Sequence, residues 1–218
     1  MQKLPENTRT STARIYGGQE QHERMATRRQ RFIEAGIELF GSVGYQATTM
    51  RTLTAKAELT NRYFYELFET MEDLLIACYE QVMNDFGSRL QQVMEHNHAT
   101  LKDRLRAATR CYFEEIRKPC FARITQVEVI GVSARLDALY IKAYRVYGKQ
   151  LIDYLCVKKP PSSTIQEREL AILGEALAGA MSIAGAMWMR SRYQDDIDTL
   201  VDAILKILMG TAQILETT

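Results

Sequence analysis

The chain has 218 residues, 46% of them hydrophobic and 25% charged, and its formal net charge is +1 at pH 7. This balance is typical of a globular protein that buries a core. It excludes a protein whose whole surface is basic, so any surface that attracts nucleic acid would have to be local.

Sequence features of secretion and of metal chemistry are missing. The N-terminus is polar and no apolar run approaches the roughly 20 residues that span a membrane, so we expect a cytoplasmic protein without a membrane partner. The four cysteines form no Cys-x-x-Cys pair, which favours buried reduced thiols, with a thiol sensor as the alternative. The three histidines form no metal-binding pair, and neither a metal nor another cofactor is expected.

Hydrophobic spacing predicts an all-α fold. Apolar residues recur at intervals of three and four over almost the whole chain, and only four prolines occur. Residues 1–23 lack this periodicity and are expected to form a flexible N-terminal arm. Residues 24–70 should form a three-helix domain and residues 71–218 a larger helical domain. The expected helices, about nine in all, are 25–43, 50–57, 60–68, 71–95, 100–118, 120–130, 133–157, 166–191 and 195–215.

The segment from Thr48 to Asp73 predicts two short helices joined by a three-residue turn. Helices this short bury little surface of their own, and such a pair is typical of a motif that presents its second helix to the DNA major groove. On that helix Arg62 fits a guanine edge, and Asn61 fits an adenine edge or a phosphate. Tyr63 can meet a thymine methyl group or a phosphate.

Hydroxyl groups at the helix starts add candidate phosphate contacts. Thr48, Thr49 and Thr60 offer side chains and free backbone N–H groups there, with plain helix capping as the alternative. Glu66 and Glu69 oppose this interpretation and should point away from the duplex or accept from a cytosine amino group.

An arginine cluster precedes this motif. Arg24, Arg28, Arg29 and Arg31 fall in the first turns of the first expected helix, where the macrodipole makes each cation unfavourable by roughly 0.3–1 kcal/mol. Such a cluster favours a bound anion, and the spacing of three of its members suits consecutive phosphates. A solvated polar face is the alternative. The full set of candidate DNA-binding residues is Arg24, Arg28, Thr48, Thr49, Arg51, Thr60, Asn61, Arg62, Tyr63 and Tyr65.

The run from Arg29 to Val82 resembles the N-terminal domain of the TetR family of bacterial transcriptional regulators. The resemblance rests on a linked set of marks, namely the Glu34–Phe40 helix, Gly44-Tyr45, Ala47-Thr48-Thr49 and Tyr65-x-x-Phe68-x-x-x-Glu72-Asp73-Leu74-Leu75. It implies that the family's DNA-contacting positions are held by Thr48 or Thr49, Thr60, Asn61, Arg62, Tyr63 and Tyr65.

Two residues depart from the family pattern. Glu58 stands in the turn where the family usually has Gly, so either a left-handed conformation costs roughly 1–2 kcal/mol or the turn differs slightly. Met71 stands where a phosphate-contacting Lys is common, so we expect that contact to be lost and the upstream arginines to substitute for it.

The last two expected helices predict a dimer. The helix at 166–191 is rich in Gly and Ala, which lets another helix approach closely, and the helix at 195–215 has a long apolar face. A two-fold four-helix interface follows, with burial inside the monomer as the alternative. The resemblance agrees, since family members dimerise through their last two long helices. The expected interface residues are Leu177, Ala180, Ala184, Ile197, Val201, Ile204 and Leu208.

Aromatic and Met residues recur on the helices between these regions. Such residues are more often core, yet tyrosine hydroxyls need partners and a cluster of them can line a cavity. The resemblance implies an inducer pocket there, which would make residues 71–218 a ligand-binding and dimerisation domain. The candidate pocket residues are Tyr79, Met83, Phe86, Tyr112, Glu128, Tyr144 and Trp188.

These features together predict a homodimeric, ligand-responsive transcriptional regulator, by the family's usual outcome a repressor, on a palindromic DNA operator. Its partners would be double-stranded DNA, a second copy of the chain and a small-molecule effector. We expect it in the cytoplasm, associated with the nucleoid. An α-helical enzyme is disfavoured because no nucleophile, base or metal constellation stands out, and no catalytic residue is expected. A helical ligand-binding or interaction module with weakened DNA binding is the other alternative, suggested by Glu58, Glu66 and Met71.

Overall fold

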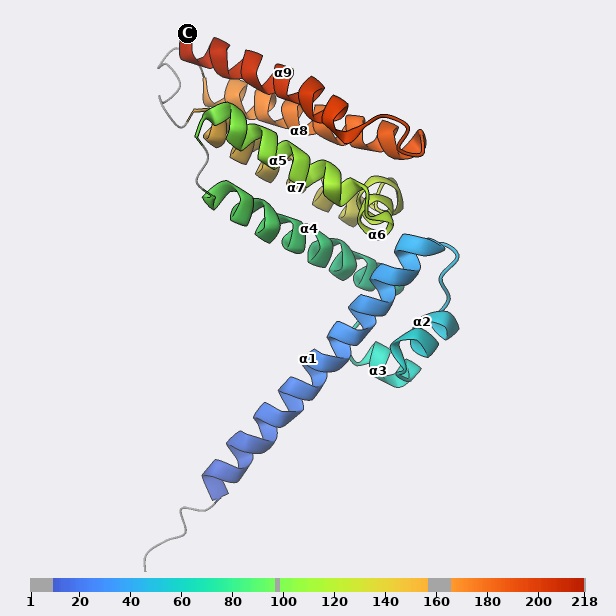
Figure 1. Ribbon diagram of the computed structural model, residues 1–218. Helices are drawn as coiled ribbons and strands as arrows, with labels where there is room; N and C mark the ends of the chain where they lie inside the picture. Colours follow the sequence, from blue (N-terminus) through green and yellow to red (C-terminus); the bar gives the residue numbers. More distant parts are fainter. Residues whose placement is uncertain (1–9, 97–98, 157–165, 218) are drawn as a thin grey trace, which may run out of the picture.

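A computed structural model describes residues 10–96, 99–156 and 166–217 of the chain. Within those ranges the ordered elements are all helices, which confirms the all-α prediction (Figure 1). The elements are α1 (Thr10–Ser42), α2 (Met50–Ala57), α3 (Asn61–Tyr65), α4 (Met71–Glu95), α5 (Leu101–Ile116), α6 (Pro119–Arg123), the π-helix η1 (Ile124–Glu128), α7 (Ala134–Leu155), α8 (Glu167–Arg190) and α9 (Ile197–Thr217).

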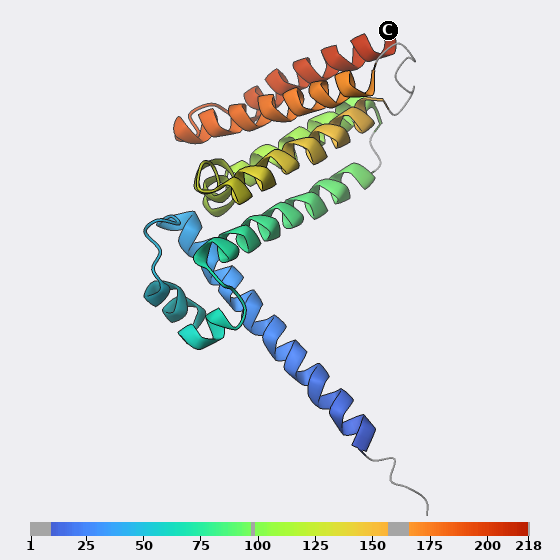
Figure 2. The ribbon, with the colours of Figure 1, turned by 180° about the vertical axis from the view of Figure 1, so that it is seen from behind.

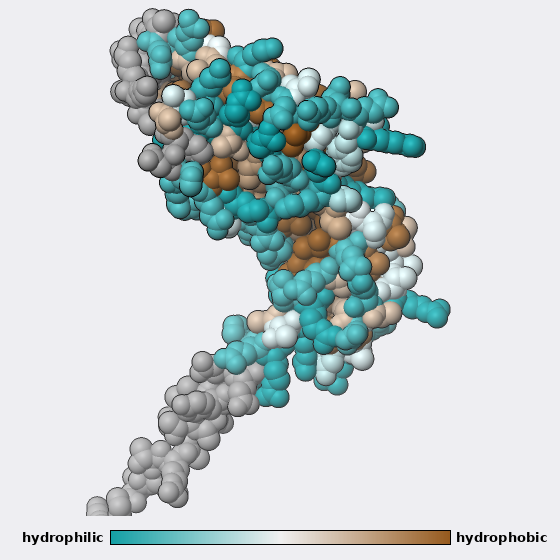
Figure 3. Space-filling model, viewed as in Figure 1, coloured by the Kyte–Doolittle hydropathy of each residue, from teal (hydrophilic) through white to brown (hydrophobic). Residues whose placement is uncertain are grey.

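The helices form a small head and a larger body. In the head, α2 and α3 pack beside the long helix α1, which runs obliquely away from the rest (Figures 1 and 2). In the body, α4 lies nearest the head, α5 and α7 form the middle layer, and α8 and α9 form the outer layer. Figure 3 shows hydrophobic residues where the head meets the body, on a face that is otherwise mostly hydrophilic. We call α1–α3 the head and α4–α9 the body below.

Helix α1 begins at Thr10, far ahead of the expected start near Met25. Residues 10–23 are therefore helical, and the expectation of an arm without regular structure is wrong for them, while residues 1–9 lie outside the described part. No proline follows Pro5 until Pro119, so no residue there is unable to continue the helix. The macrodipole argument for the arginine cluster is consequently wrong as well, because that effect is confined to the first turn of a helix and the cluster lies well inside α1.

Three phenylalanines form the core of the head. The Phe32 ring packs edge-on against Phe64 and Phe68, with centroids 5.5 and 6.3 Å apart. Phe32 and Phe64 are completely buried. Since Phe64 is anchored in this way, the rest of the five-residue helix α3 is held at the surface of the head.

Local capping fixes where α2 and α4 begin. The Thr49 hydroxyl accepts from the Thr52 N–H, and the Thr70 hydroxyl accepts from the Asp73 N–H, each within a reciprocal capping box. The turn between α2 and α3 contains Glu58 in the left-handed region, with φ 51° and ψ 42°. The left-handed alternative for that turn is therefore the one that the chain adopts.

The backbones of α7 and α8 touch through two glycines. A Cβ atom on Gly174 would lie 2.4 Å from the Gly148 carbonyl oxygen, and one on Gly148 would lie 2.5 Å from the Gly174 carbonyl carbon. Neither neighbour is a flexible side chain that could move aside. The small residues of α8 therefore serve, in part, a contact within the chain.

The segment expected as one helix over 120–130 is instead α6 followed by the π-helix η1. Single π-helical turns are rare and are frequent at functional sites, because they redirect the side chains that follow. Here the change of pitch lets one short segment face both the body and the head, as described below.

Candidate functional site

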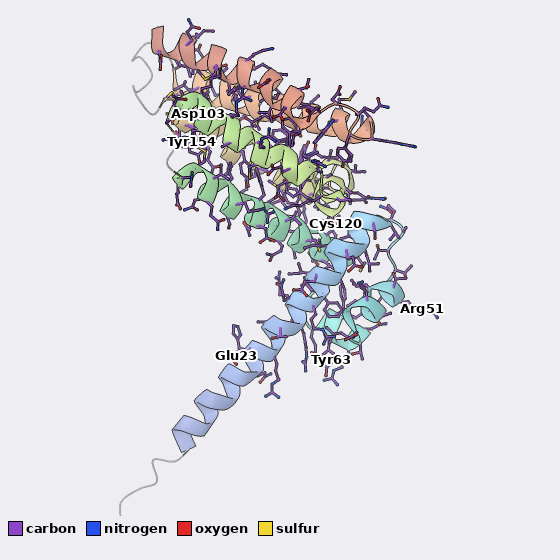
Figure 4. All side chains as sticks on the ribbon, in the orientation of Figure 1. Glu23, Arg51, Tyr63, Asp103, Cys120 and Tyr154 are labelled. Carbon is purple, nitrogen blue, oxygen red and sulfur yellow. The ribbon has the colours of Figure 1, made fainter. Side chains whose placement is uncertain are left out.

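The outer surface of the head carries most of the residues expected to contact DNA. Thr49, Arg51, Thr60, Asn61 and Arg62 are all exposed. Figure 4 shows Arg51 on the outer side of α2, away from α1, and Tyr63 on the α3 side of the head. The structure thus brings the N-terminal ends of α2 and α3 onto one solvent-facing surface, which we call the head surface.

Arg62 and Tyr65 are the most prominent side chains on the head surface. Arg62 is 85% exposed and its Nε donates to the Glu66 carboxylate across 3.0 Å. An exposed pair of this kind contributes little to stability, so Arg62 can exchange Glu66 for a base edge. Tyr65 is 64% exposed, and its ring packs against that of the buried Phe64. Glu66, one of the two acidic residues that opposed DNA binding in the sequence, is therefore paired with Arg62.

The arginines of α1 support the head surface through contacts with α3 and the turn. The Arg28 guanidinium lies 3.9 Å from the centre of the Tyr63 ring, a cation–π contact. Arg31 forms a 2.9 Å ion pair with Glu58, the residue in the left-handed turn. Arg28 and Arg31 thus fix the position of Tyr63 and of the turn, a role that the sequence did not reveal.

The three threonines differ in what they can offer a phosphate. The Thr48 side chain is buried and its hydroxyl donates to the Gly44 carbonyl across 2.7 Å, so its only proton is already used. Its place among the candidate DNA contacts is wrong for that reason. Thr60, in contrast, is exposed and makes no side-chain capping bond to α3. Thr49 is exposed as well, beside the start of α2.

The body contains a cavity of about 110 Å³. Five of the seven candidate pocket residues line it, namely Tyr79, Met83, Phe86, Tyr112 and Tyr144. Further lining residues were not singled out from the sequence, and the most polar of them are Thr109, Thr125, Gln126, Gln150 and Ser182. Tyr140 and Tyr147, two of the aromatic residues that recur on these helices, line the cavity as well.

A chain of hydrogen bonds crosses one wall of the cavity. The Tyr144 hydroxyl donates to Ser182 across 2.8 Å, and Ser182 donates to the Gln126 side-chain oxygen across 3.0 Å. The Tyr140 hydroxyl lies 2.5 Å from that of Tyr144 and so acts as the donor to it. Burial raises the pKa of Tyr144, and it raises the pKa of Tyr147 to about 12. The Tyr144 and Tyr147 phenols are therefore neutral at ordinary pH.

Two candidate pocket residues do not line the cavity, and the prediction is wrong for both. Trp188 packs edge-on against Phe113 and Tyr193, and its indole N–H donates to the Asp195 carbonyl across 2.9 Å. It closes the connection between α8 and α9. Glu128 points instead toward the junction of head and body, where its carboxylate binds polar partners. A hydrophobic pattern in the sequence does not predict such partners.

This junction is a clamp formed by Arg123 and Glu128. The two side chains pair across 2.6 Å, and Glu128 also accepts from the Tyr45 backbone N–H across 2.8 Å. Arg123 donates to the carbonyl oxygens of Ser42 and Val43, at the C-terminal end of α1. The same α6–η1 segment supplies Phe121, Thr125 and Gln126 to the cavity. One short segment thus touches the cavity on one side and the head on the other.

The outer helices expose an apolar strip that differs from the expected interface. Leu177, Val201, Ile204 and Leu208 are buried inside the chain, so their assignment to a dimer interface is wrong, whereas Ala180, Ala184 and Ile197 are partly exposed. The large exposed apolar residues are instead Ile172, Ile183 and Met187 on α8 and Ile207 and Ile214 on α9. Both helices are apolar on more than one face, and the wider apolar face of each packs into the core of the monomer. We call the exposed set the outer strip.

Helix α8 is also long and apolar enough to cross a membrane by length and composition, contrary to the expectation from the sequence. Its most apolar 18-residue window is 17% buried within the chain. Gly174 of this helix meets the α7 backbone, and Leu177 and Trp188 are buried in the core. Among the described residues, no group of three His, Cys, Asp or Glu side chains could hold a metal ion.

Comparison with known proteins finds similarity in the N-terminal part of the chain. Residues 32–78 match the sequence model of the family described as "Bacterial regulatory proteins, tetR family". The fatty acid metabolism regulator protein of Bacillus subtilis (strain 168) is 20% identical over 180 residues, which cover 82% of this chain and 92% of that protein.

Solved structures share the fold over 82–86% of the chain. The fatty acid degradation regulator FadR of Bacillus halodurans superposes with a TM-score of 0.69 at 18% identity, covering 84% of this chain and 95% of that one. FadR of Bacillus subtilis in complex with stearoyl-CoA gives the same TM-score and identity over 82% of this chain and 96% of that one. A TetR-like regulator from Rhodococcus sp. RHA1 gives a TM-score of 0.63 at 18% identity over 86% and 97%.

Proposed function

We propose that the chain is a ligand-responsive transcriptional regulator of the TetR family, a proposal supported by the match of residues 32–78 to the model of that family. It would bind a palindromic DNA operator as a homodimer in the cytoplasm, with repression by occlusion as its usual outcome. The observation that carries the proposal is the head surface, where α3 is anchored by the buried Phe64 and presents Asn61, Arg62 and Tyr65 to solvent.

DNA binding by this surface is testable directly. The affinity of the full chain for duplex DNA should fall steeply as salt rises, because the arginines release counterions from phosphates. It should also differ strongly between an operator and random DNA, because base contacts come from α3. A weak affinity that is the same for every sequence would favour the alternative, a helical module with weakened DNA binding.

We propose that the outer strip is the surface through which two copies associate. Contiguous exposed apolar surface of this kind commonly marks an interaction site, and the spacing of Ala203, Ile207, Gly210 and Ile214 along α9 keeps these positions on one face. Two such strips related by a two-fold axis form a four-helix interface. That interface would place two α3 helices about 34 Å apart, in successive major grooves.

Replacing Ile183 by Asp should weaken dimerisation by about 30-fold or more, the ~2 kcal/mol typical of an interface anchor. Ile183 is 66% exposed within the chain, so its replacement leaves the monomer core intact. Sedimentation equilibrium measures the dimer dissociation constant. Ile141→Asp on α7 is the matched control, because Ile141 is 50% exposed but lies outside the outer strip. Equal dimerisation of both variants would place the interface elsewhere.

We propose that the cavity is the effector site, and that the clamp transmits its occupancy to the head. The named functions of the relatives and the stearoyl-CoA complex suggest an effector with an acyl group, which suits an apolar lining. A ligand that displaces Thr125 or Gln126 would shift η1 and with it the Glu128 carboxylate. The end of α1 and the Tyr45 N–H would follow, and the spacing of the two heads would change.

Replacing Arg123 by Ala should reduce the effect of the effector on DNA affinity, while the effector itself still binds. Coupling between such sites is typically 1–3 kcal/mol, so the effector should lower the DNA affinity of the native protein by roughly 5- to 150-fold. In the Arg123 variant this factor should be several times smaller. Glu128→Gln is a second variant that keeps the side-chain size. Fluorescence anisotropy with labelled operator measures the response.

Arg145→Ala is the control for this experiment, because Arg145 forms an exposed ion pair with Glu175 between α7 and α8, away from the clamp. The coupling proposal fails if the Arg123 variant releases DNA as fully as the native protein does.

A further inference from the structure

The cavity contains two buried hydroxyl groups without hydrogen-bond partners. The side-chain oxygen of Thr109 and the phenol oxygen of Tyr112 make no hydrogen bond to any of the described residues. Thr109 is 1% exposed. The two residues are three apart on α5, so both side chains fall on the same face of that helix, and both line the cavity.

These hydroxyls take no part in the hydrogen-bonded chain that includes Tyr144, Ser182 and Gln126. Tyr140, Tyr144, Ser182 and Gln126 form a sequence in which each hydroxyl already has an acceptor. The Tyr147 hydroxyl donates to the Met83 carbonyl across 3.2 Å. A threonine within a helix can donate to the carbonyl four residues before it, yet Thr109 makes no such bond. Among the fully buried side-chain atoms of the described lining residues, the two without a partner are therefore both on α5.

A buried hydroxyl without a partner is destabilising, and native proteins usually supply one. Burial, the largest influence, raises the pKa of Tyr112 well above its usual value, whereas the nearby Ser182 hydroxyl lowers it. The phenol therefore keeps its proton and can donate it. Two neutral donors on adjacent turns suit one acceptor atom of a ligand, such as a carbonyl oxygen.

The lining also limits the charge of the ligand. None of the described residues that line the cavity is an Asp, Glu, Lys, Arg or His. A carboxylate inside would be buried without a cation, which costs far more than the burial of a neutral group. The volume of about 110 Å³ is of the same order as the ~150 Å³ cavity known to hold a benzene molecule, so the enclosed part of a ligand is compact.

We propose that the cavity selects an uncharged, mostly apolar molecule whose hydrogen-bond acceptor is held by the Thr109 and Tyr112 hydroxyls. Esters, thioesters and ketones belong to this class, and free carboxylates and plain hydrocarbons do not. The inference rests on the proposal that the cavity is the effector site, and it adds the chemistry that the effector must carry.

Three probes of similar size test the selection. Ethyl benzoate carries an uncharged acceptor, benzoate a carboxylate and propylbenzene no polar group. Titration calorimetry on the full chain without DNA should give ethyl benzoate the highest affinity of the three. Thr109→Val and Tyr112→Phe should each lower the affinity for ethyl benzoate by about 3- to 10-fold, the value of one hydrogen bond. The same variants should leave propylbenzene binding unchanged or improved.

Tyr147→Phe is the matched control. It removes a phenol from the same cavity, but one that already donates to Met83, so ethyl benzoate should bind it as it binds the native protein. Both hydroxyl variants remove an unpartnered buried group, so neither should lose thermal stability when no probe is present.

Several results would overturn the inference. Benzoate binding as tightly as the ester, equal ester affinity in Thr109→Val, Tyr112→Phe and the native protein, or no binding of any probe would each do so. Failure of the proposed function is recognised separately, because DNA affinity is measured without these probes. A chain that selects the ester but does not bind an operator would support the cavity chemistry and reject the regulator.

Discussion

Replacing Arg62 by Ala is expected to weaken operator binding by about 30-fold or more. A bidentate contact from an arginine to a guanine contributes about 1–3 kcal/mol of discrimination, and a dimer makes the contact twice. The fold should be unaffected, since Arg62 is 85% exposed and its described partner is Glu66 across a surface pair. Fluorescence anisotropy gives the affinity, and circular dichroism with urea unfolding gives the stability.

Two further variants make this result specific. Tyr65→Ala should also reduce operator affinity, because Tyr65 is exposed on the same helix. Arg145→Ala removes the same charge and a similar exposed pair from the body, and it should bind the operator like the native protein. If Arg62→Ala and Tyr65→Ala both bind all DNA as the native chain does, the head surface is not a DNA-reading surface.

Replacing Gly174 by Ala is expected to lower the free energy of unfolding by about 2 kcal/mol. Overpacking typically costs about 1–3 kcal/mol, occasionally more, and the gain in helix propensity offsets about 1 kcal/mol of it. The cost should fall at the upper end of its range because the added Cβ would meet the Gly148 backbone at 2.4 Å, and separation of α7 from α8 would also open the cavity between them. Urea unfolding followed by circular dichroism measures the loss.

Gly87→Ala is the control for this substitution. Gly87 also lies inside a helix, but its added Cβ would meet only the Tyr147 hydroxyl, at an ordinary contact distance of 3.5 Å. That variant should be as stable as the native protein or more so, through helix propensity. Equal stability of the two variants would show that α7 and α8 do not approach as closely as the structure has them.

Local features of the sequence predicted the helix boundaries that depend on local chemistry. Helices α2 and α4 begin as expected because Thr49 and Thr70 cap them through residues three positions later. The start of α1 could not be found in this way, because the polar stretch from Thr10 lacks an apolar face and still continues a helix. Hydrophobic periodicity predicts a helix that packs one face against a core. It cannot predict a helix that has no packed face.

Site residues were predicted correctly where they lie on one face of a single helix. They were missed where two segments that are distant in sequence meet. Tyr112 and Tyr144 were found because aromatic residues gather on helices that can line a cavity. Glu128 was assigned to the same cavity, but its partners are Arg123 and the Tyr45 backbone, 83 residues away in sequence. Likewise, Leu208 has the apolar spacing of an interface residue, and only the packing of α9 shows that it is buried within the chain.

Selection of bound duplexes from a random DNA library by the native full chain tests the central claim most directly. The account predicts enrichment of an inverted repeat whose half-site centres are about one helical turn apart, or a multiple of it, with two copies of the chain per duplex. Arg62→Ala should fail to enrich that sequence. A library that emerges without any enriched sequence, or with single half-sites bound by one copy, would contradict the account.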